Sequence, residues 1–579
     1  MMNRIDSMPR PATGQVATGA RLGLLLIKPS HYDEDGYVIQ WRRSFIPAHV
    51  LAVVEGIFQD AAGRAAPGVA SIETRAINEA SSVVRPAKLI AWLRGFDRAA
   101  VMMIGVQSSQ FPRALDLSRD FVAAGFPVVI GGFHISGSMS MVPGWEPAFT
   151  GAAEAGVTLY AGELECGVDA LVADLVAGTI RPLYNHLKST ADMGLSPQAT
   201  LGTSATDGTL NGTAGMDVGR GCPFQCSFCT IINVHGRTMR NRDPSSIEAY
   251  LRDCAARGIH NLMVTDDNFA RSPIWREVTE IMARLQRELG IEWDAMIQVD
   301  TLATRMKGFV EACKAAGVKR VFIGMESVRP DNLKAASKGQ NKVHQMRDMI
   351  MAWKEAGIMI YAGVIIGFPA DTPERIAEDI RTFQTDIPID VIEIFALTPL
   401  PGSEDHQRLV AAGVDMDLDL NRYDTVHVVT DHPRMTRDAW TRLYWQSWEM
   451  FYTTAHMKTL IGRAILYKLP LGELRTSLLG FVGAVRYERV HPVDGGLFRI
   501  RNRLSRRRGH RVVPALPHAL IRAVEITVVQ SRFLMLLARI LRCEAAVRWD
   551  LLRGRRAPYL CAQTPAPARA APDLAAAAE

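Results

Sequence analysis

The sequence lacks the features that would place it in or across a membrane. It contains no uninterrupted run of roughly 18 uncharged apolar residues, the length that a membrane-spanning helix needs. Residues 1–20 also lack the continuous apolar segment of a secretory signal. We therefore expect a cytoplasmic protein without a membrane span.

Cysteine and excess charge are scarce as well. Eight cysteines among 579 residues are too few for a disulfide framework. The net charge is only +6, and seven arginines cluster between Arg499 and Arg511, so the composition does not imply a nucleic-acid partner. Three of the eight cysteines fall between Cys222 and Cys229, which indicates reduced thiols that serve a metal.

Residues 21–185 show alternating strand and helix patterns. The apolar runs typical of buried strands are Leu22–Lys28, Ala100–Val106, Pro127–Gly131 and Val157–Tyr160. Apolar residues recur at helical spacing between them, in Ala48–Ala61 and Ala114–Ala124. This alternation predicts an α/β domain with a doubly wound parallel sheet, of the Rossmann type.

A second α/β unit is predicted over residues 214–430. Its expected strands are one before the cysteines, followed by Asn261–Thr265, Glu292–Gln298, Arg320–Met325, Met359–Ile366 and Val391–Leu397. Six strand–helix units are too few to close an eightfold barrel, so we expect a partial (β/α)6 barrel that is open on one side. Its active site should lie at the carboxyl ends of the strands.

The remaining segments carry weaker patterns. Residues 186–213 are rich in Ser, Thr, Gly and Asn and predict a linker. Residues 431–560 predict a helical C-terminal region, with helices in Thr436–Tyr467 and Ala519–Leu552. We expect disordered tails at residues 1–20 and 561–579.

The cysteine cluster has the spacing C-x3-C-x2-C, with Cys222, Cys226 and Cys229 on the loop after the first barrel strand. A loop can wrap three thiolates around one cubane. Three protein thiolates leave one iron of a [4Fe–4S] cluster without a protein ligand, and an open metal position can bind a substrate. Structural zinc is the alternative, although no fourth Cys or His ligand is evident apart from His235.

This spacing, with the aromatic Phe228 before the third cysteine, resembles the radical S-adenosylmethionine (SAM) superfamily. The resemblance implies that SAM chelates the open iron and that its reductive cleavage yields methionine and a 5′-deoxyadenosyl radical. It also implies an electron donor of the flavodoxin or ferredoxin type.

Three strand ends in the predicted barrel match places where this family contacts SAM. The resemblance assigns SAM binding to Asp266, Asp267 and Asn268, to Glu326 and Ser327, and to Gly363, Ile365, Gly367, Phe368 and Pro369. The last group resembles the family's G-x-I-x-G motif, in which small residues allow adenine to approach the backbone. The acidic pair departs from the family's Gly-Gly-Glu-like pattern, and a solvated acidic turn or helix cap is its alternative.

A doubly wound domain before such a barrel resembles the cobalamin-binding members of the superfamily. The resemblance assigns cobalamin contacts to Gly131, Gly132 and His134, and the segment Gly162–Glu165 matches a recurring motif of this class. The D-x-H-x-x-G pattern that supplies a histidine to cobalt is absent after Lys28. His134 could equally be a hydrogen-bonded structural histidine, and a domain that binds nothing stays open.

The resemblance favours a cobalamin-dependent methyltransferase that acts on an unactivated centre of a small molecule or lipid. A radical SAM cyclase or rearrangement enzyme is one alternative, and a non-catalytic iron–sulfur or zinc scaffold is another. Methylthiolation of transfer RNA needs three further N-terminal cysteines, but only Cys166 precedes Cys222. Peptide-modifying members with auxiliary clusters are disfavoured because only Cys543 and Cys561 follow the barrel.

The residue pattern of the predicted C-terminal helix is compatible with contact with a membrane surface. Arg522, Arg532, Arg539 and Arg542 share one side of it with Glu525, and the other side is apolar. A basic amphipathic helix beside an arginine cluster can rest on anionic lipid. The alternative is a helix that packs on the barrel with a solvated basic face.

Overall fold

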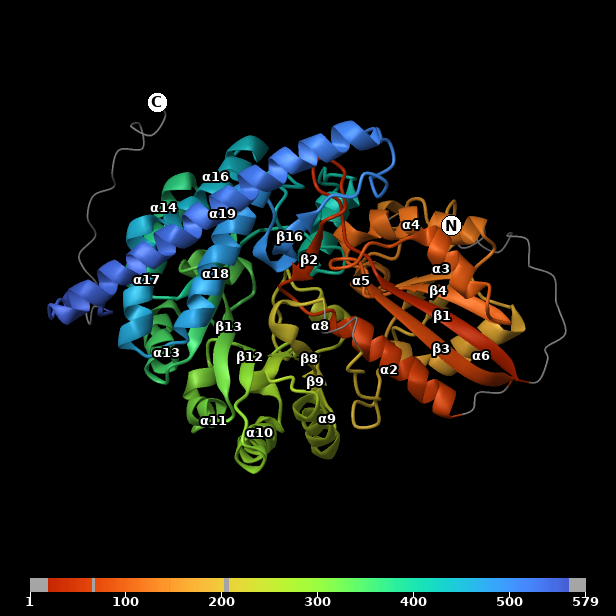
Figure 1. Cartoon of the computed structure of the whole chain (residues 1–579), viewed down its shortest axis with the longest axis horizontal. Coiled ribbons are helices and arrows are strands. Elements are labelled where there is room, and N and C mark those ends of the chain that lie inside the picture. The colour runs from red at the N-terminus through yellow and green to blue at the C-terminus, as the bar shows by residue number, and fades with distance from the viewer. Residues whose placement is uncertain (1–18, 65–67, 145, 203–207, 562–579) are drawn as a thin grey trace.

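The computed structural model describes residues 19–64, 68–144, 146–202 and 208–561. The predicted tails lie almost entirely outside these residues. Two α/β units lie side by side, and a long C-terminal helix runs along one side of the molecule (Figure 1).

The first unit contains a six-stranded parallel sheet with the order β3-β1-β4-β5-β6-β7. Its strands are β1 (Ala20–Lys28), β3 (Val69–Asn78), β4 (Arg98–Met103), β5 (Val128–Gly131), β6 (Thr158–Ala161) and β7 (Leu183–Asn185). This is the flavodoxin-like strand order, in which the order of successive strands reverses between β1 and β4. Ligands of such sheets bind at the carboxyl ends of the strands, at that switch point.

Helices cover both faces of this sheet, because alternate residues of β1 point to opposite sides. Leu24 and Leu26 pack in one core with α2 (His49–Gly63) and α6 (Val168–Ala177). Leu25 and Ile27 pack in the other core with α3 (Pro86–Leu93) and α4 (Phe111–Ala123). The predicted doubly wound fold is confirmed.

The second unit is a six-stranded parallel sheet with the order β15-β14-β13-β12-β11-β8. Its strands are β8 (Ala214–Met216), β11 (Asn261–Val264), β12 (Asp294–Val299), β13 (Val318–Glu326), β14 (Met359–Ile366) and β15 (Val391–Ala396). β8 and β15 are the two edges and do not pair, so the barrel is partial, as predicted. The main helices of this unit are α9 (Pro244–Ala256), α10 (Trp275–Leu289), α11 (Phe309–Ala315), α13 (Val343–Glu355) and α14 (Pro373–Thr385).

The C-terminal region is helical, as predicted, and closes the side of the barrel. The predicted helix over Thr436–Tyr467 is two helices, α16 (Arg437–Phe451) and α17 (Thr454–Leu466), separated where Thr453 caps the second. They are followed by α18 (Leu471–Gly483) and the 38-residue α19 (Ala515–Leu552). No helix in the described part of the chain is long and apolar enough to cross a membrane.

The sequence analysis missed six of the strands in the described residues: β2 (Gln40–Ser44), β3, β7, the two-residue strands β9 (Gly219–Arg220) and β10 (Arg240–Asn241), and β16 (Gly496–Ile500). β3 is an edge strand whose side chains alternate between partial burial and exposure, so it lacks an apolar run. β2 and β16 form an antiparallel ribbon that joins the first domain to the C-terminal region. The predicted domain limits near 185 and 214 coincide with gaps between sheets, and we keep them as proposals.

Candidate active site

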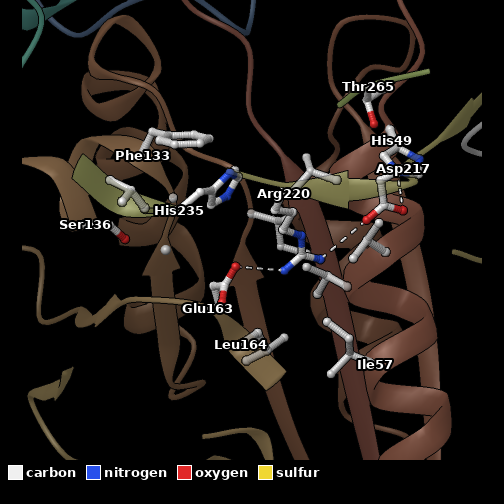
Figure 2. A pocket seen from close by; sticks show the side chains of 18 of the residues that line it. His49, Ile57, Phe133, Ser136, Glu163, Leu164, Asp217, Arg220, His235 and Thr265 are labelled. Atoms are coloured by element: carbon white, nitrogen blue, oxygen red, sulfur yellow. Dashed lines mark hydrogen bonds and ion pairs between the residues drawn. The ribbon is translucent and has the colours of Figure 1, made fainter. Parts of the chain in front are cut away.

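A cavity of about 450 Å³ lies between the carboxyl ends of the first sheet and the barrel domain. Its walls include Lys28 at the end of β1, Gly105 after β4, Gly131 at the end of β5, and side chains of α2. Arg220 and His235 of the barrel domain line the opposite side (Figure 2). The cavity therefore occupies the switch point at which this class of sheet binds ligands.

The two predicted glycines both line this cavity but serve different needs. Gly132 has a φ of +147°, and a Cβ on it would lie 2.2 Å from the backbone nitrogen of Val106. Glycine is therefore required there by the packing of the protein itself. Gly131 has ordinary backbone geometry, and an added Cβ would meet Tyr160 at an ordinary 3.5 Å.

His134 lies outside the lining of this cavity. Its side chain is buried, with Nδ1 3.0 Å from Ser108 Oγ and Nε2 2.7 Å from the carbonyl oxygen of Ala148. Burial lowers the pKa of His134 to about 4, so the imidazole is neutral. With both ring nitrogens engaged inside the protein, the alternative interpretation as a structural histidine fits His134, and a contact with cobalamin does not.

Ion pairs across the cavity connect the two domains. Arg220, on β9 (Gly219–Arg220), contacts Glu163 at 3.2 Å and Asp217 at 3.8 Å (Figure 2). It also contacts Glu165 at 2.8 Å. Glu163 also binds Arg240 of the barrel domain at 2.8 Å. Burial would raise the pKa of Glu163, but the two guanidinium groups outweigh it and hold the pKa at about 2. The predicted Gly162–Glu165 motif is thus part of the domain interface.

Asp217 extends this network toward α2. Its carboxylate lies 3.2 Å from His49 Nε2 and 3.0 Å from Arg242, whose side chain is fully buried. Burial disfavours the charge on Asp217, but His49 and Arg242 together hold its pKa well below the usual range. Glu163, Glu165 and Asp217 therefore each have a cationic partner.

The three cysteines lie on the loop that follows β9. All three are free and partly buried, and the Cys229 amide donates a hydrogen bond to the Cys226 carbonyl at 3.1 Å. Gln340 Nε2 contacts Cys226 Sγ at 3.7 Å. Burial raises the pKa of each thiol, to about 12 for Cys229. Within the described residues, no three His, Cys, Asp or Glu side chains are arranged to hold a metal ion.

Asp266 and Asp267, the acidic pair after β11, form hydrogen bonds with the segment that leads into the cysteine loop. Asp266 accepts a hydrogen bond from the Val218 amide at 2.6 Å, and Asp267 accepts one from the Gly221 amide at 2.7 Å. Asp267 also lies 3.2 Å from His235 Nδ1. Both aspartates line the cavity between the domains. Asn268 donates a hydrogen bond to Asp300 at 2.9 Å, and its side chain also favours the Cys222 thiolate.

At the end of β13, Glu326 forms a buried ion pair with Lys338, a residue that the sequence analysis missed. Glu326 has a φ of +63°, a strained conformation for a side chain other than glycine. Burial alone would lower the pKa of Lys338, but Glu326 and Cys226 raise it, so the ammonium persists. Lys338 Nζ lies 5.8 Å from the centre of the Phe228 ring. Ser327 Oγ accepts a hydrogen bond from Asn332 at 3.1 Å.

The end of β14 packs beside the cysteine loop. Ile365 and Phe368 form a small apolar cluster with Ala336, and Phe228 lies against it. Gly367 has a φ of +106°, and a Cβ there would overlap Trp440 of α16 at 1.8 Å, so glycine is required by packing.

The other two residues of this motif differ in their surroundings. A Cβ on Gly363 would lie 2.8 Å from the ring of Phe322, inside the barrel. Pro369 is exposed. The structure therefore brings the strand ends and the cysteine loop to one mouth of the barrel, as predicted.

Comparison with known proteins bears on this architecture. Residues 216–442 match the radical SAM superfamily. The chain is 26% identical over 360 residues to a hopanoid C-2 methylase of Rhodopseudomonas palustris, covering 60% of this chain and 64% of that protein. It is 25% identical over 352 residues to a bacteriochlorophyllide d C-8(2)-methyltransferase of Chlorobaculum tepidum, covering 57% and 73% respectively.

A solved structure extends the likeness in fold to both domains. The cobalamin-dependent radical SAM enzyme OxsB, bound to aqua-cobalamin and SAM, superposes with a TM-score of 0.54 at 12% identity. The match covers 93% of this chain and 81% of OxsB. The [4Fe–4S] cluster and SAM are the cofactors of the superfamily. Residues 216–442 thus form a radical SAM enzyme domain, and the chain shares the two-domain fold of OxsB, as its sequence motifs predicted.

Proposed function

We propose that this chain is a cobalamin-dependent radical SAM methyltransferase that acts on a small molecule or lipid. The observation that carries the proposal is the position of Cys222, Cys226 and Cys229, three free cysteines at the mouth of a partial barrel that faces a flavodoxin-like domain. The cluster and SAM, when bound, supply a 5′-deoxyadenosyl radical, and cobalamin supplies a methyl group.

The chain's own residues fit a cluster on these thiols. Thiolates are the ligands that iron–sulfur clusters use, and buried thiols ionise only when a cation stabilises them. The ammonium of Lys338 and the amide of Gln340 lie beside Cys226 and favour its thiolate. Asp267 holds the Gly221 amide and so fixes the start of the loop.

The cavity between the domains is the proposed cobalamin site. It lies at the switch point of the first sheet, and its apolar floor from α2 and β4 faces the ion pairs of Arg220. We propose that Gly131 lies against the ligand, whereas Gly132 serves the packing around Val106.

Methyl transfer is favoured over cyclisation or rearrangement because both curated relatives named above are methylases or methyltransferases. An external donor of the flavodoxin or ferredoxin type would supply the electron. The test is the coproduct balance. Methyl transfer of this type consumes two SAM molecules, so S-adenosylhomocysteine and 5′-deoxyadenosine should appear in near-equal amounts, and label from methyl-deuterated SAM should reach the product. Formation of 5′-deoxyadenosine without S-adenosylhomocysteine would instead support a cyclase or rearrangement enzyme.

The cluster assignment has its own test. Cys226→Ala should abolish both the cubane absorption and SAM cleavage after anaerobic reconstitution. The matched control is Cys313→Ala, because Cys313 is buried in the packed core on α11 and far along the chain from the loop. Retained cleavage in Cys226→Ala would overturn the assignment.

We also propose that α19 rests on an anionic membrane. Seven of its large apolar side chains are 56–82% exposed: Leu516, Leu520, Val524, Leu534, Met535, Trp549 and Leu552. At ~100° per residue they lie within about 100° of the helix circumference, and Arg542 shares this arc. The buried residues Leu536, Ile540, Cys543 and Val547 lie on the opposite side.

This arrangement differs from the sequence prediction, which placed a single apolar side opposite the basic one. α19 has two apolar stripes, and only one is packed, along part of its length. The outward stripe contains no acidic residue, because Glu525, Glu544 and Asp550 lie outside the arc and pair with cations. An apolar stripe with arginines at its edge fits anionic lipid.

Vesicle flotation tests the membrane proposal. The double variant Leu520→Glu/Leu534→Glu should lose binding to vesicles that contain phosphatidylglycerol, and high salt should weaken wild-type binding. The control is Leu195→Glu/Leu418→Glu, because these leucines are as exposed but lie elsewhere on the chain. Equal flotation of the two double variants would overturn the proposal.

A further inference from the structure

A second cavity, of about 300 Å³, lies inside the barrel. It opens between the inner faces of the strands and α18, and Phe45 to Pro47, just after β2, form part of its rim. Its walls are mainly apolar, with Met263, Met296 and Phe322 from three successive strands of the sheet. Pockets of this size and character are typical of small-molecule sites.

One charged group in this cavity has no partner. Glu393, on β15, is only 7% exposed and lines the cavity, and its carboxyl group makes no hydrogen bond or ion pair with any described residue. Several other polar side chains in the lining do have partners. Arg320 binds Asp294 at 2.6 Å and Glu473 at 3.3 Å, and the Tyr361 hydroxyl lies 2.6 Å from Ser477 Oγ.

A buried and unpaired carboxyl group is costly, by several kcal/mol if it is charged. Burial accordingly raises the pKa of Glu393 to about 7. The buried carboxylates beside Arg220 in the other cavity, Glu163 and Asp217, are paired by contrast. An unpaired acid in an apolar cavity is what a site that receives a hydrogen-bond donor from a ligand requires.

The cavity also reaches the proposed reaction site. Gln298 lines both this cavity and the cavity between the domains. Phe395 lines this cavity and packs against the cluster of Ile365 and Phe368 beside Phe228. A molecule held at Glu393 would therefore extend toward the residues that are proposed to contact SAM.

We propose that this cavity binds the substrate, and that the substrate is an apolar molecule whose polar end donates a hydrogen bond to Glu393. The donor is an ammonium or a hydroxyl group; a carboxylate is disfavoured, because it would face Glu393, and the cation in the lining, Arg320, already pairs with Asp294 and Glu473. That the ligand of this cavity is a substrate rests on the proposed function. The preference of the cavity for a ligand that donates a hydrogen bond to Glu393 does not rest on it.

Three probes with one apolar body and different polar ends test the proposal. They are 1-adamantanamine, 1-adamantanol and 1-adamantanecarboxylate, titrated by calorimetry into the anaerobic, cluster-loaded full chain without SAM. We expect the amine or the alcohol to bind at least about tenfold more tightly than the carboxylate. Preference for the amine would identify a cationic substrate, and equal binding of amine and alcohol would identify a neutral hydroxyl donor.

Three variants locate the binding. Glu393→Leu should weaken the preferred probe at least about tenfold, and Met296→Trp, which fills the cavity, should abolish binding of all three. Glu393→Gln should retain the alcohol within about threefold, because the amide oxygen still accepts a hydrogen bond, but should lose the amine. The control is Glu449→Gln, an exposed glutamate on α16.

Tight binding of the carboxylate, or unchanged binding of the preferred probe in Glu393→Leu, would overturn the proposal. The result of the probe-binding test can be distinguished from the result of the coproduct test of the proposed function. Probe binding that follows the prediction, in an enzyme that yields no S-adenosylhomocysteine, would retain the site and reject methyl transfer. Methyl transfer without selective probe binding would retain the proposed function and reject the site at Glu393.

Discussion

The cavity between the domains and the cavity inside the barrel both have buried carboxylates in their walls, but the carboxylates around Arg220 are paired with cations, whereas Glu393 is paired with none in the described part of the chain. Around Arg220 the carboxylates Glu163, Glu165 and Asp217 all lie within 4 Å of a guanidinium. Inside the barrel, Glu393 has no partner among the residues that the structure describes. The difference indicates that charge in the first cavity joins two domains, whereas charge in the second is reserved for a ligand.

Of the changes that test this comparison, removal of Arg220 should have the largest effect on the free energy of unfolding. Arg220→Leu leaves several carboxylates facing one another, and breaking a buried ion pair on one side costs about 3–5 kcal/mol. The free energy of unfolding, measured by urea denaturation, should fall by this amount, and Arg220→Lys should recover part of it. A loss below about 1 kcal/mol in Arg220→Leu would show that the network is not a domain clamp.

Acid should remove the same network in a defined pH window. Because the pKa of Glu163 is lowered from 4.5 to about 2, its pairing stabilises the fold above pH 4.5 and is lost as the pH falls toward 2. At neutral pH, Glu163→Gln should be less stable than wild type by at most about 3 kcal/mol. That difference should shrink steadily below pH 4.5. A constant difference down to pH 2 would contradict the assigned pairing.

Replacement of Glu393 should have the opposite sign. Glu393→Leu removes an unpaired buried carboxyl group from an apolar cavity, so the free energy of unfolding at pH 8 should rise by about 1–3 kcal/mol. Thermal denaturation would measure the gain. Destabilisation on this scale would mean that Glu393 has a structural partner, and the contrast between the two cavities would fail.

Much of the fold could be predicted because its strands are local, apolar and separated by helical periodicity. The six barrel strands and the cysteine loop follow from such patterns. The ion pairs could not be predicted, because Arg220 and Glu163 are 57 positions apart and meet only when two domains dock. Glu393 also escaped, since a single glutamate in an apolar strand gives no indication of whether it is paired.

The exposed stripe of α19 could not be predicted from the sequence for a different reason. Its sequence is apolar on two sides, and periodicity alone does not reveal which side packs on the protein.

The different roles of the two switch-point glycines could not be predicted either. Gly131 and Gly132 look equivalent in sequence, but only Gly132 has a backbone that excludes other residues.

The smallest predicted effect separates these two glycines. Gly132→Ala should destabilise the protein by about 1–3 kcal/mol, because its φ and the contact with Val106 both disfavour a side chain. Gly131→Ala should change stability by less than about 0.5 kcal/mol. Thermal denaturation of the two variants makes the comparison, and similar losses would show that the switch-point turn tolerates no side chain at either position.

The ribbon of β2 and β16 has a consequence for the synthesis of the chain. Gln40–Ser44 emerges early from the ribosome, but its partner Gly496–Ile500 emerges some 450 residues later. At ~5–20 residues per second, β2 stays an unpaired strand edge for at least about 20 seconds. A nascent chain is therefore vulnerable to strand-edge association during that interval, and a ribosome that stalls before residue 496 leaves this edge permanently open.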